Sequence, residues 1–248
     1  FLVFSPERID PGNKQFNAKN TPKVVGGLGR PATDLACRVF ELIIDAKSVL
    51  PVSSPRTAEM TKLLENIYRS VNIALVNELT MLADRMGINM WEVIDAASSK
   101  PFGFMPFYPG PGVGGHCIPV DPYYLSFKAR EYDFWTKFIE LAAEVNSNMP
   151  EYTVSRLQRS LFERSGGALA GAKILAIGAT FKKNIDDMRH SAAVRVIEIM
   201  MEQGAQVEYH DPYVPSIDVT CHPYDGRKQA SKRLASVPLD QKTLSRSD

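Results

Sequence analysis

Residues 110–124 read Gly-Pro-Gly-Val-Gly-Gly-His-Cys-Ile-Pro-Val-Asp-Pro-Tyr-Tyr, and the interpretation of the whole chain depends on them. Four glycines among the first six residues give a backbone with little side-chain bulk, which allows a ligand to approach closely. Cys117 follows, and Asp121-Pro122 predicts an N-cap and first turn of a helix over 122–131. Since positive partial charge at a helix N-terminus favours a thiolate, we expect Cys117 to be a nucleophile.

Two other interpretations of this stretch compete with a nucleophile. An isolated cysteine is usually a small buried apolar residue, but a loop this rich in glycine costs entropy and needs a reason. Gly110, Gly112 and Gly115 also match the spacing of a dinucleotide-binding turn. No apolar strand precedes them and Pro111 removes an amide, so the loop is not predicted to bind a dinucleotide.

The same residues carry a resemblance to a known family. Residues 110–125 are similar to the catalytic loop of the nucleotide-sugar 6-dehydrogenases, the UDP-glucose/GDP-mannose dehydrogenase family. Residues 100–108, Lys-Pro-Phe-Gly-Phe-Met-Pro-Phe-Tyr, resemble the branch that oxidises UDP-N-acetylhexosamines, and the resemblance extends from Phe1 to about Pro215. It implies NAD-dependent, two-step oxidation of the C6 alcohol of a UDP-sugar to the uronic acid. The alternatives are a UDP-glucose or UDP-N-acetylmannosamine 6-dehydrogenase, or an inactive, dimerising fragment of such an enzyme.

The amino-acid composition limits which classes of binding partner are expected. The 248 residues include 29 basic and 28 acidic side chains, a balance that argues against nucleic acid. Cys37, Cys117 and Cys221 are odd in number and widely spaced, which indicates neither a disulfide framework nor a metal site, and the four histidines form no ligand pattern. There is no apolar run near the roughly 20 residues of a membrane span and no signal-peptide pattern, so we expect no membrane partner and a cytoplasmic location.

The order of predicted elements indicates an α/β fold with an all-α middle. Strands near 1–4 and 23–27 and a helix over 33–49 predict that residues 1–54 are the end of an α/β domain. The resemblance implies that this is the end of the Rossmann-like, NAD-binding domain. Because the chain begins within a strand, the resemblance implies that the first part of that domain is absent and that this polypeptide alone is inactive.

The rest of the chain divides into a helical and a second α/β segment. A helix over 57–86, a short one from Trp91, and a run over 134–164 with a kink or interruption at Pro150 predict a central, homodimerising domain at 55–165. A strand from Lys173, a helix over 191–203 and a strand from Gln206 predict a second, incomplete α/β domain at 166–248. The resemblance implies that this domain binds the UDP-sugar. The polar residues 219–248 are expected to be disordered or to form a helix and linker.

The resemblance also implies roles for particular residues. Cys117 would form a thiohemiacetal and then a thioester. Lys62 and Asn66, four residues apart on one helix face, would stabilise its oxyanion. Either Lys62 or a water held by Asp121 and Asn66 would accept the alcohol proton, and Glu7 would activate the hydrolytic water. Without the resemblance, Lys62, Asn66 and Glu7 would be read as ordinary polar residues, and Asp121 as a helix cap only.

The predicted substrate-binding residues lie on two loops. Lys182 and Arg189 stand where parallel strands end and are suited to diphosphate oxygens. The full predicted substrate-binding set comprises Tyr108, Gly112, Gly114, Gly115, Phe181, Lys182 and Arg189.

Overall fold

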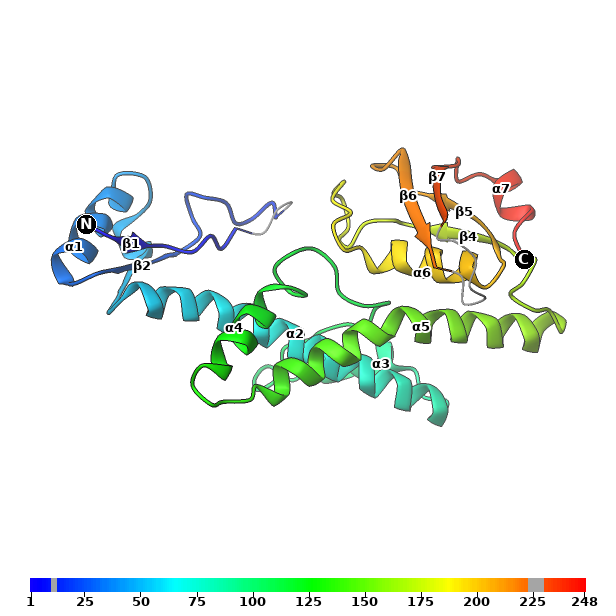
Figure 1. The fold of residues 1–248 in the computed structure, drawn as a ribbon, viewed down its shortest axis with the longest axis horizontal. Helices are drawn as coiled ribbons and strands as arrows, with labels where there is room; N and C mark the ends of the chain where they lie inside the picture. Colours follow the sequence, from blue (N-terminus) through cyan, green and yellow to red (C-terminus); the bar gives the residue numbers. More distant parts are fainter. Residues whose placement is uncertain (10–12, 223–229) are drawn as a thin grey trace. The chain divides into compact units, whose positions relative to one another are not determined.

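The computed structural model describes residues 1–9, 13–222 and 230–248, which form two compact units, 1–68 and 69–248 (Figure 1). Its mixture of helices and small sheets agrees with the predicted α/β fold class.

The first unit contains a small sheet with one helix against it. Strand β2 (Lys23–Gly27) pairs antiparallel with β1 (Val3–Phe4) and parallel with β3 (Val49–Val52). Helix α1 (Arg30–Glu41) connects the two parallel strands and packs on them. The core of the unit comprises Val25, Cys37, Ile44 and Val49.

The helix predicted over 33–49 is wrong at both ends. It begins at Arg30 and stops at Glu41, and a short 3-10 turn, Ala46–Ser48, leads into β3. The side chain of Asp45 accepts a hydrogen bond from the Lys47 amide, which favours the turn over a continued helix. Residues 49–52 read Val-Leu-Pro-Val, and proline is tolerated there because β3 lies at the sheet edge.

Helices dominate the middle of the chain. The long helix predicted at 57–86 is confirmed as α2 (Pro55–Met86), and Gly87 follows it with φ +68°. Two short helices follow, α3 (Met90–Ser98) and α4 (Asp121–Arg130). Helix α5 (Lys137–Ser165) continues through Pro150, which excludes the interruption but leaves the kink as a prediction, and the helix ends at the left-handed Gly166. Pro150 is buried within it.

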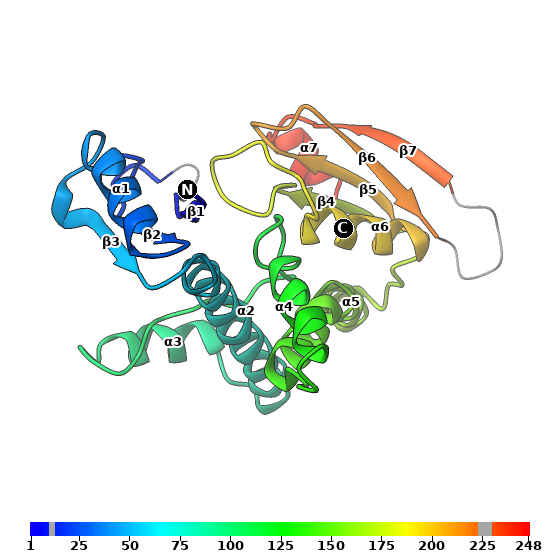
Figure 2. The same ribbon diagram turned by 60° about the vertical axis from the view of Figure 1, so that its left-hand side comes forward.

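The last segment contains the predicted β–α–β unit. Strands β4 (Lys173–Ile177) and β5 (Gln206–His210) are parallel, and α6 (Ala192–Glu202) connects them and lies along one side of them (Figure 2). The buried side chains at its centre include Val154, Ile197, Ile199, Tyr209, Ile217 and Val219.

The expectation of a disordered or helical tail after Val219 is wrong for the described residues. Strands β6 (Ser216–Cys221) and β7 (Ala230–Ala235) form an antiparallel pair, and the short α7 (Gln241–Ser245) follows. Ile217 and Val219 alternate with exposed residues, and this alternation places them in the core. Residues 223–229 of the expected tail lie outside the described residues.

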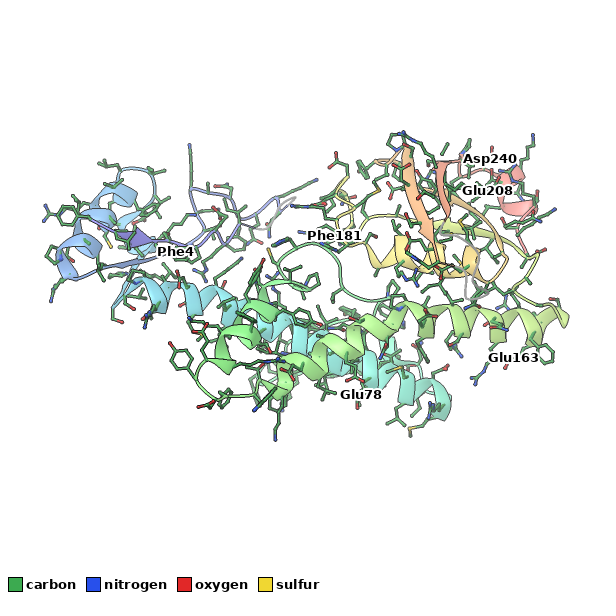
Figure 3. All side chains as sticks on the ribbon, viewed as in Figure 1. Phe4, Glu78, Glu163, Phe181, Glu208 and Asp240 are labelled. Atoms are coloured by element: carbon green, nitrogen blue, oxygen red, sulfur yellow. The ribbon has the colours of Figure 1, made fainter. Side chains whose placement is uncertain are left out.

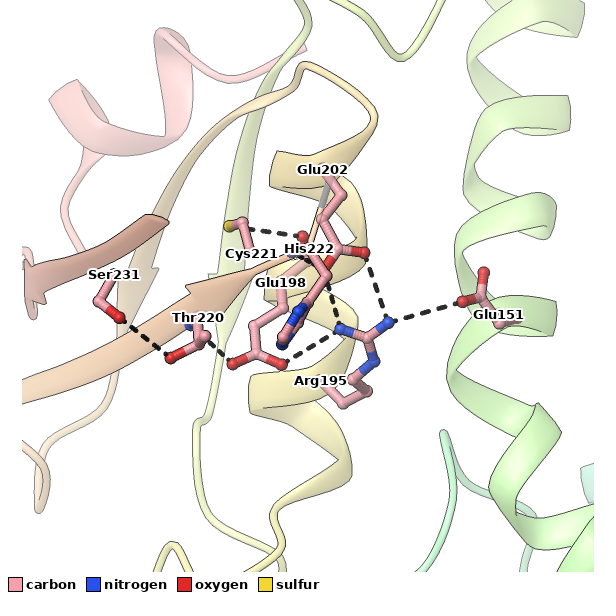
Figure 4. A network of polar contacts seen from close by, with 8 residues as sticks. All are labelled: Glu151, Arg195, Glu198, Glu202, Thr220, Cys221, His222 and Ser231. Atoms are coloured by element: carbon pink, nitrogen blue, oxygen red, sulfur yellow. Dashed lines mark hydrogen bonds and ion pairs between the residues drawn. The ribbon is translucent and has the colours of Figure 1, made fainter. Parts of the chain in front are cut away.

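A charged cluster joins α5, α6 and β6 (Figure 4). The Arg195 guanidinium lies 3.0 Å from Glu202, 3.4 Å from Glu198 and 3.8 Å from Glu151 on α5. The same two α6 carboxylates accept the backbone amides of Thr220 and His222 at 2.8 Å. Each carboxylate thus has both an ionic and a backbone partner, which compensates for its removal from water.

Charged side chains project from the outer faces of the long helices, for example Glu78 on α2 and Glu163 on α5 (Figure 3). Within the described residues, none of the helices has the length and apolar character that crossing a membrane requires.

Candidate active site

The glycine loop, residues 110–115, packs closely against α5, α6 and the loop after β4. A Cβ on Gly112 would lie 3.1 Å from both the Ala192 Cβ and the Asn146 carbonyl oxygen, and its φ is +130°. A Cβ on Gly114 would lie 2.4 Å from the Phe181 Cβ and 2.8 Å from the His190 carbonyl oxygen. Only glycine fits these positions without moving the backbone.

One hydrogen bond and one aromatic contact join the glycine loop to the loop after β4. The Gly115 amide donates to the Arg189 carbonyl at 2.8 Å. The Phe181 ring covers Gly115, where an added Cβ would lie 3.0 Å from Cε2. The structure therefore brings together three predicted glycines with Phe181 and Arg189.

Cys117 follows directly and is exposed. It lies in a short turn in which the Val120 amide donates to the His116 carbonyl at 3.1 Å. The Asp121 Oδ1 lies 3.6 Å from His116 Nδ1 across this turn. The thiol is thus held between the docked Gly115 and the start of α4.

The prediction that Asp121 caps α4 is wrong. Val120 is the N-cap, Asp121 is the first helical residue, and no side chain caps the helix. Pro122 accordingly occupies the second helical position, and α4 ends at Arg130. Because the Asp121 carboxylate faces His116 instead, the cap-only interpretation of this residue loses its basis.

A cavity of about 390 Å³ lies beside the glycine loop, between α5 and α6. Its lining includes Gly112, Ser147, Pro150, His190, Arg195 and Glu198.

A second cavity, of about 320 Å³, opens at the carboxyl ends of β4 and β5, where ligands of such sheets gather. Phe181 and Lys182 line it, together with Asp211, Pro212 and Tyr213. The position of Lys182 in this cavity suits a diphosphate.

Asp211 was missed by the sequence interpretation. It is buried, and its carboxylate accepts the amides of Ala179 at 2.9 Å, Tyr213 at 2.8 Å and Val214 at 3.2 Å. It therefore holds the two turns that form the second cavity. The signal was present in the sequence, because Asp211-Pro212 ends a strand with a side chain that readily binds backbone amides.

Arg189 lies in a planar ion pair. Its Nε and Nη2 donate to both carboxylate oxygens of Asp187, the shortest bond being 2.7 Å. This pairing lowers the pKa of Asp187 below its ordinary value, mainly through the side-chain bonds from Arg189. The Arg189 side chain remains 69% exposed.

Tyr108 is held by α3. Its hydroxyl donates to Asp95 Oδ1 at 2.7 Å, and its ring stacks on Trp91 with centroids 5.5 Å apart. The bond to Asp95 is the main reason why the pKa of Tyr108 is raised. Tyr108 as a whole stays 46% exposed.

The first unit holds the remaining predicted residues. Glu7 accepts the amides of Arg8 and Ile9 at 2.7 Å and pairs with Lys23 at 3.0 Å. Burial alone would raise the pKa of Glu7, but these bonds outweigh it and lower the pKa. The neighbouring Arg8 pairs with Glu65 of α2 at 2.7 Å, close in sequence to Lys62 and to the fully buried Asn66.

The two other cysteines differ from Cys117. Burial, with nearby acidic side chains, raises the pKa of both the Cys37 and the Cys221 thiols. Cys37 belongs to the core of the first unit, as the packing interpretation predicts.

The turn between β2 and α1 has a strand–glycine–helix order, and its glycines pack tightly on the protein's own backbone. A Cβ on Gly26 would lie 2.1 Å from the Ser54 carbonyl oxygen, and one on Gly27 would lie 2.4 Å from the Thr33 nitrogen. Neither glycine therefore has space for a side chain. No NAD contact is assigned to this turn.

In the part of the chain that the structure describes, no group of three or more His, Cys, Asp or Glu side chains is arranged to hold a metal ion.

Two family models match this chain. Residues 56–148 match the central domain of the UDP-glucose/GDP-mannose dehydrogenase family, and residues 175–237 match its UDP binding domain. The chain belongs to the UDP-glucose/GDP-mannose dehydrogenase family.

Several similar members of this family are named as dehydrogenases of UDP-N-acetylhexosamines. The UDP-N-acetyl-D-glucosamine 6-dehydrogenase of Pseudomonas aeruginosa is 39% identical over 88% of this chain and 51% of the relative. The UDP-N-acetyl-D-mannosamine dehydrogenase of Methanocaldococcus jannaschii is 35% identical over 86% and 47%. The solved structure of the UDP-D-ManNAc dehydrogenase of Pyrococcus horikoshii superposes with a TM-score of 0.77 at 33% identity, covering 86% of this chain and 49% of that one. The chain spans about half the length of the curated relatives it matches.

Proposed function

We propose that this chain is the catalytic-loop and UDP-binding part of a 6-dehydrogenase that oxidises a UDP-N-acetylhexosamine to its uronic acid. The observation that carries the proposal is the exposed Cys117 on a glycine loop whose Gly115 amide is bonded to Arg189. A nucleophile and a group suited to a diphosphate are thereby joined through one backbone contact. The substrates named for the P. aeruginosa and M. jannaschii relatives support the choice of sugar.

The proposed chemistry begins with oxidation of the C6 alcohol of the sugar. The alcohol loses its proton to Lys62, or to a water held by Asp121 and Asn66, as it is oxidised to the aldehyde. The Cys117 thiolate then adds to the aldehyde carbon and forms a thiohemiacetal. Lys62 and Asn66 stabilise its oxyanion, and oxidation of this adduct gives a thioester. The family pattern at these positions supports their roles.

Hydrolysis of the thioester releases the uronic acid and restores the thiol. We propose that Glu7 orients the attacking water. Its lowered pKa keeps it ionised at neutral pH, which suits it to accept a hydrogen bond from water and makes it a weak base.

The uridine diphosphate end is proposed to bind at the carboxyl ends of β4 and β5. Lys182 and Arg189 would pair with the diphosphate oxygens, while Phe181, Tyr108 and the glycines Gly112, Gly114 and Gly115 would contact the sugar nucleotide. Arg189 suits this role because a guanidinium binds phosphate through two parallel bonds. NAD is proposed as the hydride acceptor of the whole enzyme on the family alone.

We also propose a division of the chain into three domains and a homodimeric assembly. Residues 1–54 would end the NAD-binding domain, 55–165 would form the central dimerising domain, and 166–248 would belong to the UDP-sugar-binding domain. The homodimer is supported by four residues spaced along one stripe of α2 that are each at least 40% exposed, namely Leu75, Leu79, Leu82 and Met86.

The test compares UDP-N-acetylglucosamine, UDP-N-acetylmannosamine and UDP-glucose as substrates of the complete protein. We expect two NADH for each uronic acid formed and the highest kcat/KM with an N-acetylhexosamine. A higher kcat/KM with UDP-glucose would favour that alternative substrate. Lack of NADH formation with all three would contradict the proposed function.

A further inference from the structure

We propose that Asn77 of α2 and Asn146 of α5 are positioning residues, which fix the backbone at the start of the glycine loop that leads to Cys117. This inference rests on the function proposed above. Neither residue belongs to the predicted site. Both amides are buried, with 0% and 2% of their surface exposed.

The two side chains form a directional chain of hydrogen bonds. The Gly110 amide donates to Asn77 Oδ1 at 3.0 Å, and Asn77 Nδ2 donates to Asn146 Oδ1 at 2.9 Å. Asn146 Nδ2 then donates to the Ser70 carbonyl of α2 at 3.1 Å. A backbone donor at one end and a backbone acceptor at the other leave each amide a single favourable orientation.

The bond to Gly110 lies where the loop has few other backbone N–H donors. Pro109 and Pro111 have no N–H, so Gly110 supplies the one backbone donor between residues 109 and 111. The Gly110 amide is partly buried, and leaving such a donor unsatisfied is costly, so loss of the Asn77 oxygen should shift the loop rather than leave it in place.

Asn146 also meets the loop through its backbone. Its carbonyl lacks the usual helical donor four residues later, because residue 150 is proline. That oxygen lies against Gly112, where an added Cβ would be 3.1 Å away. One α5 residue therefore supports the loop at two points, through Asn77 at Gly110 and directly at Gly112.

These contacts fix the loop before it reaches the thiol. Gly110 is held by Asn77, Gly112 by α5 and Gly115 by Arg189, so Cys117 follows a segment with three successive supports.

A buried amide pair between two helices has a simpler interpretation, that it only joins α2 to α5. The direct bond to the loop favours positioning, and the two interpretations predict different kinetics.

The chain offers a matched control. Tyr152 of α5 donates to Asp84 of α2 at 3.0 Å, so it also joins these helices through a partly buried polar contact, on residues other than those that hold Gly110. Tyr152→Phe removes that contact alone. Asn77→Ala removes the acceptor of Gly110, whereas Asn77→Asp retains an oxygen for it and, when protonated, a donor for Asn146.

The experiment measures three quantities in the complete protein: the melting temperature, the rate of Cys117 alkylation by iodoacetamide, and kcat and KM for the UDP-sugar. For Asn77→Ala we expect kcat to fall about tenfold or more with KM nearly unchanged, because a displaced thiol reacts poorly while the nucleotide site remains. The alkylation rate should change several-fold as well. Asn77→Asp should recover much of both, and Tyr152→Phe should lower only the melting temperature.

Two results would overturn the inference: an Asn77→Ala protein with wild-type kcat and alkylation rate, or a Tyr152→Phe protein with an equal loss of kcat. If Asn77→Ala does not fold, Asn77→Ser supplies the same comparison with a hydroxyl too short to reach Gly110. Absence of turnover in the wild type would contradict the proposed function, and the alkylation rates would still decide this inference.

Discussion

The backbone amide of Gly115 donates a 2.8 Å hydrogen bond to the carbonyl oxygen of Arg189, which joins the cysteine loop to the loop that follows β4. Gly114, the preceding residue, has no space for a side chain at this junction. The position of the thiol therefore depends on the loop that carries the proposed diphosphate ligands.

Gly114→Ala should disrupt this junction. The new Cβ would lie 2.4 Å from the Phe181 Cβ, an atom that cannot swing away from its backbone, so one of the loops must move. We expect a loss of about 1–3 kcal/mol of stability, typical of an overpacked site, together with a large loss of turnover. Calorimetry and kinetics measure these two effects.

Gly110→Ala is the stability control for this change, because the nearest heavy atom to its Cβ would be 3.8 Å away. A Gly114→Ala protein as stable as Gly110→Ala would show that the two loops are not closely packed.

Alkylation should distinguish the three thiols. Burial raises the pKa of Cys37 and Cys221, so both have less thiolate at neutral pH, and Cys37 is also covered. We expect iodoacetamide at pH 7 to modify the exposed Cys117 first, as measured by peptide mass spectrometry. Cys117→Ser should remove the fast phase, while Cys221→Ser should retain it. A fast phase that survives Cys117→Ser would contradict this assignment.

Cys117→Ser should nearly abolish complete turnover in the whole enzyme, by several orders of magnitude, because a hydroxyl without an adjacent base is a far weaker nucleophile than a thiolate. UDP-sugar binding should persist, and this binding shows that the variant is folded. Cys37→Ser is the control for loss of a packing thiol and should act on stability alone. Turnover within a few-fold of wild type in Cys117→Ser would contradict the thioester chemistry.

The Asp187–Arg189 pair should respond to acid in a defined direction. Because the pKa of Asp187 is lowered in the folded protein, its contribution to stability is present above the unfolded-state pKa of about 3.9 and is lost as the pH falls through the lower folded-state value. NMR titration of the Asp187 carboxyl should give a midpoint below that of an unfolded peptide.

Arg189→Met should raise the Asp187 midpoint toward its ordinary value and weaken UDP binding about tenfold or more, the loss expected for a charged hydrogen-bonding partner. Arg189→Lys should restore charge without the two parallel bonds, and we expect it to recover only part of the affinity. An unchanged Asp187 midpoint in Arg189→Met would show that the ion pair does not persist in solution.

Local sequence patterns are sufficient to predict those helices, strands and loops whose signals lie within a short stretch of chain. The apolar repeat of 57–86, with Gly87 after it, predicts α2 to within two residues. The β–α–β pattern after Lys173 is also confirmed, because β4 carries a continuous apolar run and β5 pairs parallel with it. The glycine loop and Cys117 were identified in the same way, since glycine and proline restrict the backbone locally.

Tertiary structure alone decided the features that depend on contacts between distant segments. Strand β3 exists because Val49–Val52 pairs with β2, and Asp121 faces His116 instead of capping its helix. Asn77 and Asn146 read as polar interruptions of helical repeats until the fold brings their amides to 2.9 Å, 69 residues apart in sequence. A hydrogen bond between such residues leaves no local pattern, because its geometry is fixed by how two helices pack and not by the propensity of either one.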